Sequence, residues 1–198
     1  MTSLKAYVGA EVFDGMRRLG DVAVLVDGGT IAGTAAPGSL PETAERIMLD
    51  GGLIAPGFVD LHVHAPQYPQ LGLALDEPLE VWLGKYTFPL EARYADLDFA
   101  REAYGRLVKD LLAGGTTTAL YFATVHRQAT ELLAGICLNL GQRALVGKVV
   151  MDLAESCPDD YRDASPAAAI ADSRAVIEAI RALPDNDRVL PVITPRFI

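Results

Sequence analysis

The hydrophobic residues of this chain follow two different patterns. From residue 1 to about 52, short apolar runs alternate with turn-forming residues such as Asp27-Gly28-Gly29, which is typical of short β-strands. The candidate strands are Ala6–Phe13, Val22–Val26, Thr30–Gly33 and Arg46–Leu49. We therefore predict a small β-sandwich-like or meander domain over residues 1–52, and we find no chemistry in it.

Residues 53–198 alternate between strands and amphipathic helices. Apolar residues recur there at steps of three and four in three segments, as expected for helices. These segments are Leu97–Ala113, Gln128–Leu140 and the stretch from Ser165-Pro166 to Pro184. The strand-like runs around them are Leu53–Val59, Thr116–Ala123, Ala144–Asp152 and Val189–Pro195. This order predicts an α/β fold with parallel strands joined by right-handed crossovers.

The size of this region bears on its architecture. Its first strand is expected to be buried on both sides, because Leu53–Val59 is almost entirely apolar. The pattern fits either a small doubly wound sheet or the first half of a TIM-like (β/α) barrel. A complete barrel takes about 250 residues, whereas the N-terminal segment leaves roughly 145 here. We therefore expect four βα units of eight, and the end of the chain directly after a strand leads us to expect a truncated barrel.

A long connection separates the first strand from the first helix. Residues 65–93 read as an irregular stretch with a short helix around Pro78–Lys85. Ordered connections of this length are usually functional. Trp82, the only tryptophan, either packs against the domain or forms an aromatic wall for a flat ligand.

Composition excludes several classes of function. The 198 residues carry a net charge of −9, which makes nucleic acid an unsuitable partner. No apolar run approaches the length of a membrane span, and the start of the chain lacks a signal-peptide core. The two cysteines, Cys137 and Cys157, form no C-x-x-C pair, which fits a reducing cytoplasm.

The candidate chemistry centres on His62 and His64. Residues two apart in a strand share a face, so Asp60 lies with both histidines and Leu61 and Val63 lie opposite. Two imidazoles at a strand end can bind one metal ion through their ring nitrogens. The H-x-H spacing alone does not decide the matter, because two surface histidines on a strand would give the same pattern.

In parallel α/β folds, functional side chains gather at the carboxyl ends of the strands. The residues at these positions are Thr124, His126, Asp152, Arg196 and Phe197, besides the two histidines. The chain has no H-x-E…P-C-x-x-C pattern, which excludes the deaminase fold that holds zinc through cysteines.

Several segments carry a family resemblance. PGFVDLHVH resembles the first barrel strand of the amidohydrolase superfamily, in which both histidines bind the catalytic metal. The segments HAPQY, DEPLEVWLGKYTFPLEARY, GGTTTALYFATVH, GQRALVGKVVMD and VITPRF are similar to those of guanine deaminases within that superfamily. The similarity runs from about residue 53 to 198, in order and at family-like spacing. It covers the N-terminal portion of such an enzyme.

The resemblance implies hydrolytic deamination of guanine to xanthine and ammonia, with one zinc ion. Carried over by position, His62 and His64 would be metal ligands, and Gln67, Arg196 and Phe197 would contact the purine. Arg196 would present a donor fork to the guanine carbonyl and ring nitrogen, and Phe197 would either stack on the base or form a wall of the pocket. Without the resemblance, Arg196 would read as a surface charge and Gln67 as a loop side chain bonded to backbone.

Two more residues have roles that stay open. We expect His126 to support the zinc ligands or the substrate without binding the metal itself. Alternatively, it is a partly buried histidine whose hydrogen bonds are satisfied within the fold. Asp60 either orients a ligand or caps a turn.

The family also places functional residues that this chain does not contain. The proton-shuttling glutamate, a further histidine and an aspartate belong to later strands, beyond Ile198. We therefore expect no complete catalytic set here and little turnover by the isolated chain, with a homo-oligomer in the full-length form. The alternatives are another amidohydrolase of the cytosine or triazine type, and a non-catalytic half-barrel that serves as an assembly module.

Overall fold

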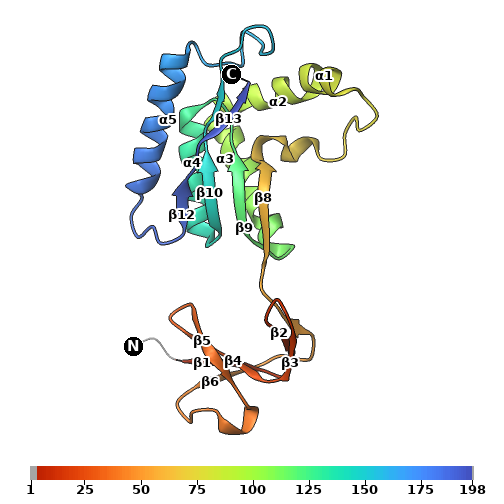
Figure 1. The fold of residues 1–198 in the computed structure, drawn as a ribbon, viewed down its shortest axis with the longest axis vertical. Helices are drawn as coiled ribbons and strands as arrows, with labels where there is room; N and C mark the ends of the chain where they lie inside the picture. Colours follow the sequence, from red (N-terminus) through yellow and green to blue (C-terminus); the bar gives the residue numbers. More distant parts are fainter. Residues whose placement is uncertain (1–3, 198) are drawn as a thin grey trace. The chain divides into compact units, whose positions relative to one another are not determined.

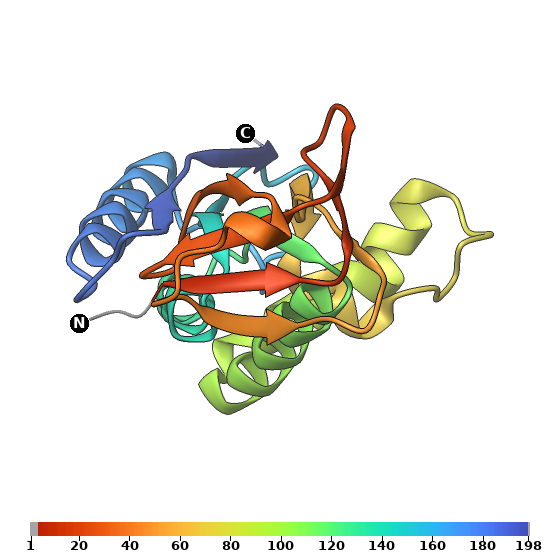
Figure 2. The ribbon, with the colours of Figure 1, turned by 90° about the horizontal axis from the view of Figure 1, so that it is seen from below.

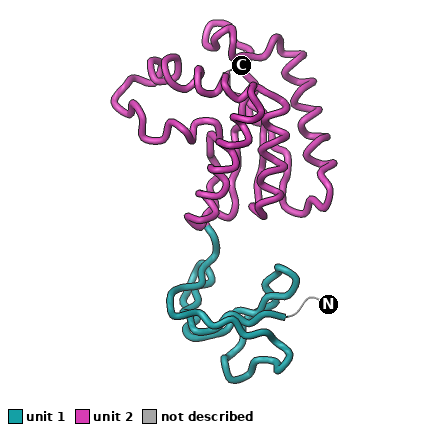
Figure 3. Tube along the Cα trace, turned by 180° about the vertical axis from the view of Figure 1, so that it is seen from behind, with its two compact units in different colours: residues 1–57 teal, residues 58–198 magenta. Residues whose placement is uncertain are grey.

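The computed structural model describes residues 4–197, in two compact units that meet in the chain at Gly57 and Phe58 (Figure 3). The first unit includes β7 (Leu53–Ile54), because this short strand pairs in parallel with β2 (Glu11–Phe13). Because Leu53 and Ile54 are apolar, we expected them to belong to the first strand of the second unit. They belong to the first unit instead.

The first unit contains a four-stranded sheet in the order β5-β4-β1-β6. Its strands are β1 (Lys5–Val8), β4 (Ala23–Asp27), β5 (Thr30–Ala35) and β6 (Glu45–Met48). Figure 2 shows β1, in red, beside β6, in orange, with both strands running the same way. A small core packs on this sheet, and it consists of Ala6, Val8, Ala23, Leu40 and Ala44. A 3-10 turn, η1 (Pro37–Ser39), connects β5 to β6.

A second sheet in this unit has the order β3-β2-β7. The expected strand Ala6–Phe13 is interrupted at Gly9, which divides it between the two sheets. Gly9 has a φ of +86°, and a Cβ there would lie 2.4 Å from the carbonyl oxygen of Leu49, so only glycine fits. The strand β3 (Arg18–Asp21) was not predicted, because three of its four residues are charged or glycine and so give no strand-like apolar pattern.

The second unit is built on four parallel strands in the order β12-β10-β9-β8. They are β8 (Phe58–His64), β9 (Thr116–Phe122), β10 (Arg143–Gly147) and β12 (Val189–Pro191). A separate parallel pair, β11 (Val149–Met151) and β13 (Thr194–Phe197), continues β10 and β12 along the chain. The two strands expected at residues 144–152 and 189–195 are therefore each split in two.

Three helices cover one face of this sheet (Figure 1). They are α3 (Leu97–Ala113), α4 (Arg127–Leu140) and α5 (Pro166–Arg181), close to the predicted spans. Asp96 caps α3 by accepting from the amides of Asp98 and Phe99, and Ser165 caps α5. The core joins alternate strand residues such as Tyr121 to the helices, so the other strand residues face the opposite side of the sheet.

The connection between β8 and α3 is mostly helical, which differs from the irregular stretch we expected. After η2 (Ala65–Gln70), the chain forms α1 (Leu79–Trp82), a π turn (Leu83–Thr87), α2 (Phe88–Ala92) and η4 (Arg93–Ala95). Pro89 obscured this helix in the sequence. It is accommodated because it lies in the first turn of α2, directly after the π turn.

The expectation that the first strand of the sheet is buried on both sides is wrong. Phe58, Val59 and Leu61 of β8 are 69%, 60% and 62% exposed. The reason is that β8 lies at the edge of the sheet and, among the residues that the structure describes, pairs only with β9. Within residues 4–197, no helix combines the length and the apolar character that crossing a membrane requires.

Candidate functional site

His62 and His64 meet at the carboxyl end of β8, as the spacing predicted. Their Nε2 atoms lie 3.2 Å apart and their rings meet edge to face, with centroids 5.1 Å apart. The register of β8 against β9 shifts between Asp60 and Val63, so the strand is irregular just where the histidines begin. Asp60 accepts from the backbone amide of His62 at 3.0 Å, and thereby caps this irregularity.

Phe122 of β9 supports both imidazoles. Its ring centroid lies 4.7 Å from that of His62 and 5.0 Å from that of His64, on which it stacks. Phe122 is the register partner of His64 in the neighbouring strand. Sequence reasoning treated it as an ordinary strand residue. Parallel pairing of two strand ends is the signal that would have placed it beside the histidines.

The electrostatic surroundings keep His64 neutral. Burial, followed by the positive charge of Arg196 and by His62, lowers the pKa of His64 to about 4. A neutral imidazole is the form that binds metal ions. The Nδ1 atom of His64 is buried and has no hydrogen-bond partner among residues 4–197.

The two imidazoles fit part of a zinc site. Nitrogen ligands of a tetrahedral zinc ion, each at about 2.0–2.1 Å from the metal, lie roughly 3.3–3.4 Å apart, close to the 3.2 Å between these Nε2 atoms. An N–H···N hydrogen bond between the rings has a similar length. No group of three His, Cys, Asp or Glu side chains suited to a metal occurs in the described part of the chain. Two imidazoles are fewer than the three protein ligands that a catalytic zinc takes.

Gln67 and Arg196 lie together because both bind the same carboxylate. Gln67 Nε2 donates to Glu91 Oε1 at 2.8 Å, and Arg196 Nη1 donates to Glu91 Oε2 at 2.6 Å. Glu91 is fully buried in α2, and 9% of the Arg196 side chain is exposed. Glu91 lies in one of the segments that carry the family resemblance, but its role was not predicted. Its partners lie 24 and 105 residues away, so no local pattern reveals it.

Aromatic rings surround the guanidinium of Arg196. It lies 5.5 Å from the ring centroid of Phe88 and 5.3 Å from that of Phe197, within the range of cation–π attraction. The two phenylalanines meet edge to face at 6.0 Å, and Tyr161 packs on Phe88 at 6.1 Å. Burial and the negative charge of Glu91 raise the pKa of the Tyr161 hydroxyl, so this hydroxyl stays protonated.

A pocket of about 430 Å³ opens beside the two histidines. Gln67 and Trp82 also line it, and the indole N–H of Trp82 donates to the carbonyl of Leu73 at 3.3 Å. Trp82 therefore both packs its own segment and forms a wall of the pocket, so the two alternatives from the sequence are compatible. The leucines along this pocket are Leu71, Leu73, Leu75, Leu107 and Leu111.

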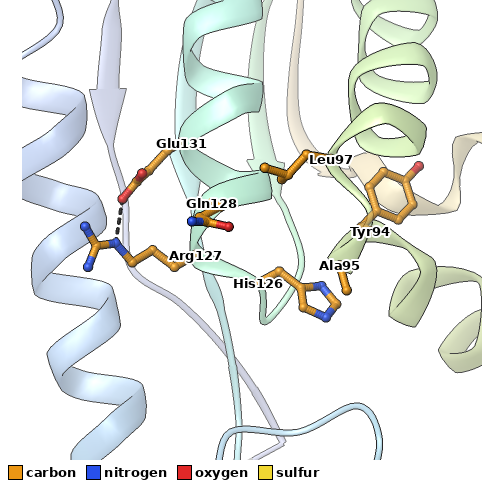
Figure 4. Close-up of a pocket in the computed structure, with 7 residues that line it drawn as sticks. All are labelled: Tyr94, Ala95, Leu97, His126, Arg127, Gln128 and Glu131. Atoms are coloured by element: carbon orange, nitrogen blue, oxygen red, sulfur yellow. Dashed lines mark hydrogen bonds and ion pairs between the residues drawn. The ribbon is translucent and has the colours of Figure 1, made fainter.

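His126 lies at a different pocket, of about 600 Å³, at the start of α4 (Figure 4). Its Nδ1 is 3.2 Å from the Thr124 hydroxyl, and its ring packs on Tyr161 at 5.7 Å. Burial lowers the pKa of His126, and the charge of Lys148 adds to this effect. Figure 4 shows Tyr94 and Leu97 across from His126, and the ion pair of Arg127 and Glu131 along α4.

Comparison with known proteins connects this arrangement to one family. Residues 53–197 match the model of the Amidohydrolase family. The chain is 47% identical over 142 residues to a guanine deaminase of Homo sapiens, which covers 72% of this chain and 31% of the relative. It is 42% identical over 158 residues to the guanine deaminase of Escherichia coli, covering 80% of this chain and 34% of the relative.

A solved structure extends the match to the whole fold. The crystal structure of guanine deaminase from C. acetobutylicum with bound guanine in the active site aligns with a TM-score of 0.87 at 35% identity. The alignment covers 98% of this chain and 46% of that chain. This chain thus spans about a third of the length of the two curated relatives.

These matches confirm the resemblance to guanine deaminases noted in the sequence motifs and the prediction of an α/β domain of the amidohydrolase type. The family match covers nearly all of the second unit and well over half of the chain. The chain belongs to the amidohydrolase family.

Proposed function

We propose that this chain is the N-terminal portion of a zinc-dependent guanine deaminase, which hydrolyses guanine to xanthine and ammonia. Its second unit would supply the first four βα units of a TIM-like barrel, and its first unit would be the small β-sandwich-like domain that precedes the barrel. The high identity to guanine deaminases over most of the chain supports this assignment.

The observation that carries the proposal is the pairing of Gln67 and Arg196 on Glu91, near the histidine pair. Arg196 approaches His64 closely enough to lower its pKa, and Gln67 lines the same pocket as both histidines. In the proposed complex, Arg196 donates to the guanine carbonyl and ring nitrogen, Gln67 bonds the purine edge, and Phe197 packs on the base. A buried cation and amide that are both held in place suit a planar, polar ligand.

One zinc ion would bind to His62 and His64. When bound, zinc would supply Lewis-acid activation of water as the nucleophile for the carbon that bears the amino group. We assign the remaining metal ligands and the carboxylate that moves protons to a part of the protein outside this chain, because the described residues form no larger ligand group. Asp60 would support the site indirectly, through the His62 backbone. His126, which contacts the Thr124 hydroxyl at a separate pocket, would be the partly buried, satisfied histidine of the two alternatives.

Partners and location follow from the same assignment. The substrate would be a free purine base. The two cysteines are free and buried, which suits a reducing cytoplasm. A homo-oligomeric full-length enzyme is an inference that rests on the family resemblance alone.

The test is ligand binding by the purified chain loaded with zinc. We expect guanine to bind more tightly than adenine, cytosine or a triazine. We expect negligible ammonia release from guanine, because we assign the carboxylate that moves protons to a part of the protein outside this chain. Tighter binding of cytosine or of the triazine would overturn the guanine assignment in favour of another amidohydrolase activity. Robust ammonia release would overturn the assignment of the missing groups to another part of the protein.

A further inference from the structure

We propose that Glu91 is a positioning residue that selects guanine by fixing which atoms of Gln67 and Arg196 face the ligand. This inference rests on the proposed function and adds a determinant of specificity to it. Glu91 lies within the segment DEPLEVWLGKYTFPLEARY that carries the family resemblance, but no role was predicted for it. It connects segments that are far apart in the chain. Gln67 follows β8, Glu91 belongs to α2, and Arg196 lies in β13.

The first step concerns the amide of Gln67. An ionised carboxylate can only accept hydrogen bonds, so Glu91 Oε1 must meet the NH₂ group of Gln67, 2.8 Å away. This bond removes the usual freedom of a glutamine amide to exchange its oxygen and nitrogen positions. The carbonyl oxygen of Gln67 is then left to accept from a ligand in the pocket that Gln67 shares with His62 and His64.

The second step concerns the guanidinium of Arg196. One of its five N–H groups is committed to Glu91 Oε2, at 2.6 Å. The rings of Phe88 and Phe197 limit its movement from other directions. Nη1 also donates to the sulfur of Met151, at 3.9 Å. The N–H groups of Nε and Nη2 are left as donors, in a plane that the rigid guanidinium sets. Because Glu91 is fully buried, water does not compete for either bond.

The two steps together give the site a fixed polarity, with an acceptor on Gln67 and donors on Arg196. Guanine offers a carbonyl oxygen to the donors and N–H groups to the acceptor. Adenine has an amino group where guanine has its carbonyl, so it would place N–H groups against the N–H groups of Arg196. Sites that hydrogen-bond a specific polar group discriminate strongly against analogues that lack it, because their own buried groups are then left unpaired.

The test compares the zinc-loaded chain with its Glu91→Gln variant, which keeps the shape but adds a donor. Dissociation constants for guanine and for adenine would be measured by equilibrium dialysis. We expect guanine affinity to fall about tenfold or more, as for loss of hydrogen bonds to a charged group, with little change for adenine. Glu102→Gln, at an exposed glutamate of α3, is the matched control and should leave both constants unchanged. An equal loss for both purines would show a merely structural role and overturn the proposal.

Two further measurements keep the proposal testable if Glu91→Gln does not fold. Gln67→Met preserves side-chain volume but removes the acceptor, so it should lower guanine affinity and spare adenine; an unchanged ratio of the two affinities would contradict the proposal. Glu91→Asp retains the charge and should keep more of the preference for guanine than Glu91→Gln does.

A spectroscopic readout separates this proposal from the proposed function. The ¹⁵N-labelled side-chain amide of Gln67 should show shifted NMR signals in the wild-type chain, owing to the bond with a carboxylate. These signals should return toward ordinary values in Glu91→Gln and stay shifted in Glu102→Gln. If the wild-type chain binds no guanine, the proposed function fails, whereas ordinary amide signals in the wild-type chain would show that Glu91 does not hold Gln67.

Discussion

Phe122 shows how a residue without polar chemistry can organise a polar site. Its ring packs against both His62 and His64, and its position in β9 is fixed by parallel pairing with β8. The Nε2 atoms consequently converge to 3.2 Å, a separation that free side chains on a strand would not hold. The metal-binding potential of the pair thus depends on a neighbouring strand as much as on the H-x-H motif.

Single substitutions of these histidines should weaken zinc binding. Each of His62→Ala and His64→Ala removes one of two nitrogen ligands, and even loss of a supporting residue typically costs 10–100-fold in metal affinity. We therefore expect each variant to lose at least about tenfold in zinc affinity, measured by titration with a competing chelator. His126→Ala should change zinc affinity by less than about twofold, as expected away from the site. A loss as large as that of the histidine-pair variants would instead place His126 in direct support of the metal.

The buried state of His126 predicts a dependence of stability on pH. Burial lowers the pKa of His126 in the folded chain below the ordinary value of 6.5, so the unfolded chain binds the proton more tightly. The free energy of unfolding therefore falls as the pH drops through 6.5, and the loss ends below the folded-state pKa. His64, with its pKa lowered to about 4, acts in the same direction.

A variant isolates the share of His126. His126→Gln cannot titrate, so its free energy of unfolding should fall less than that of the wild-type chain between about pH 7.5 and pH 5. Urea denaturation at both pH values measures this difference, and the contribution of His64 cancels in the comparison. Equal pH dependence in the two proteins would show that His126 is not held neutral by the fold.

At the level of secondary structure, local signals predicted the helices well. Asp96 and Ser165 are strong caps, and apolar spacing marked the covered face. The breaks in the strands were not predictable, because they depend on contacts with distant segments. Lys148, which separates β10 from β11, is buried and donates to Asp163 at 2.6 Å. The role of Glu91 likewise depends on its hydrogen bonds with Gln67 and Arg196, which the fold brings close to it.

The ion pair of Lys148 and Asp163 should be important for stability. Asp163 also accepts from the backbone amide of Met151, the last residue of β11, at 2.9 Å, so the pair helps to hold β11 in place. Lys148→Met leaves a buried carboxylate without its cation, which typically costs about 3–5 kcal/mol in the free energy of unfolding. Arg127→Met, in the more exposed pair with Glu131, should cost less than about 1 kcal/mol. Urea denaturation measures both, and similar small effects would show that the buried charge is otherwise compensated.

Across the whole molecule, the family and the α/β order of the second unit could be predicted from the sequence, whereas exposure could not. The apolar run at the start of β8 suggested burial, but its side chains are largely exposed. The apolar residues of β8 would suit a buried strand. At the edge of the sheet, however, β8 lacks a neighbouring strand on one side within residues 4–197. The solved guanine deaminase from C. acetobutylicum, of which this chain covers 46%, has more than twice the aligned length.

The exposed edge of β8 should make the isolated chain associate with itself. Within residues 4–197, β8 has a strand neighbour on one side only, and its residues Phe58, Val59 and Leu61 are each at least 60% exposed. Such edges pair readily with other strands. We expect the mass measured by light scattering to rise with protein concentration. Val59→Lys places a charge on this edge and should reduce the rise, whereas Met16→Lys, at a 92% exposed residue of the first unit, should not. A chain that stays monomeric at high concentration would show that β8 is protected, and would argue against the alternative that the chain serves as an assembly module.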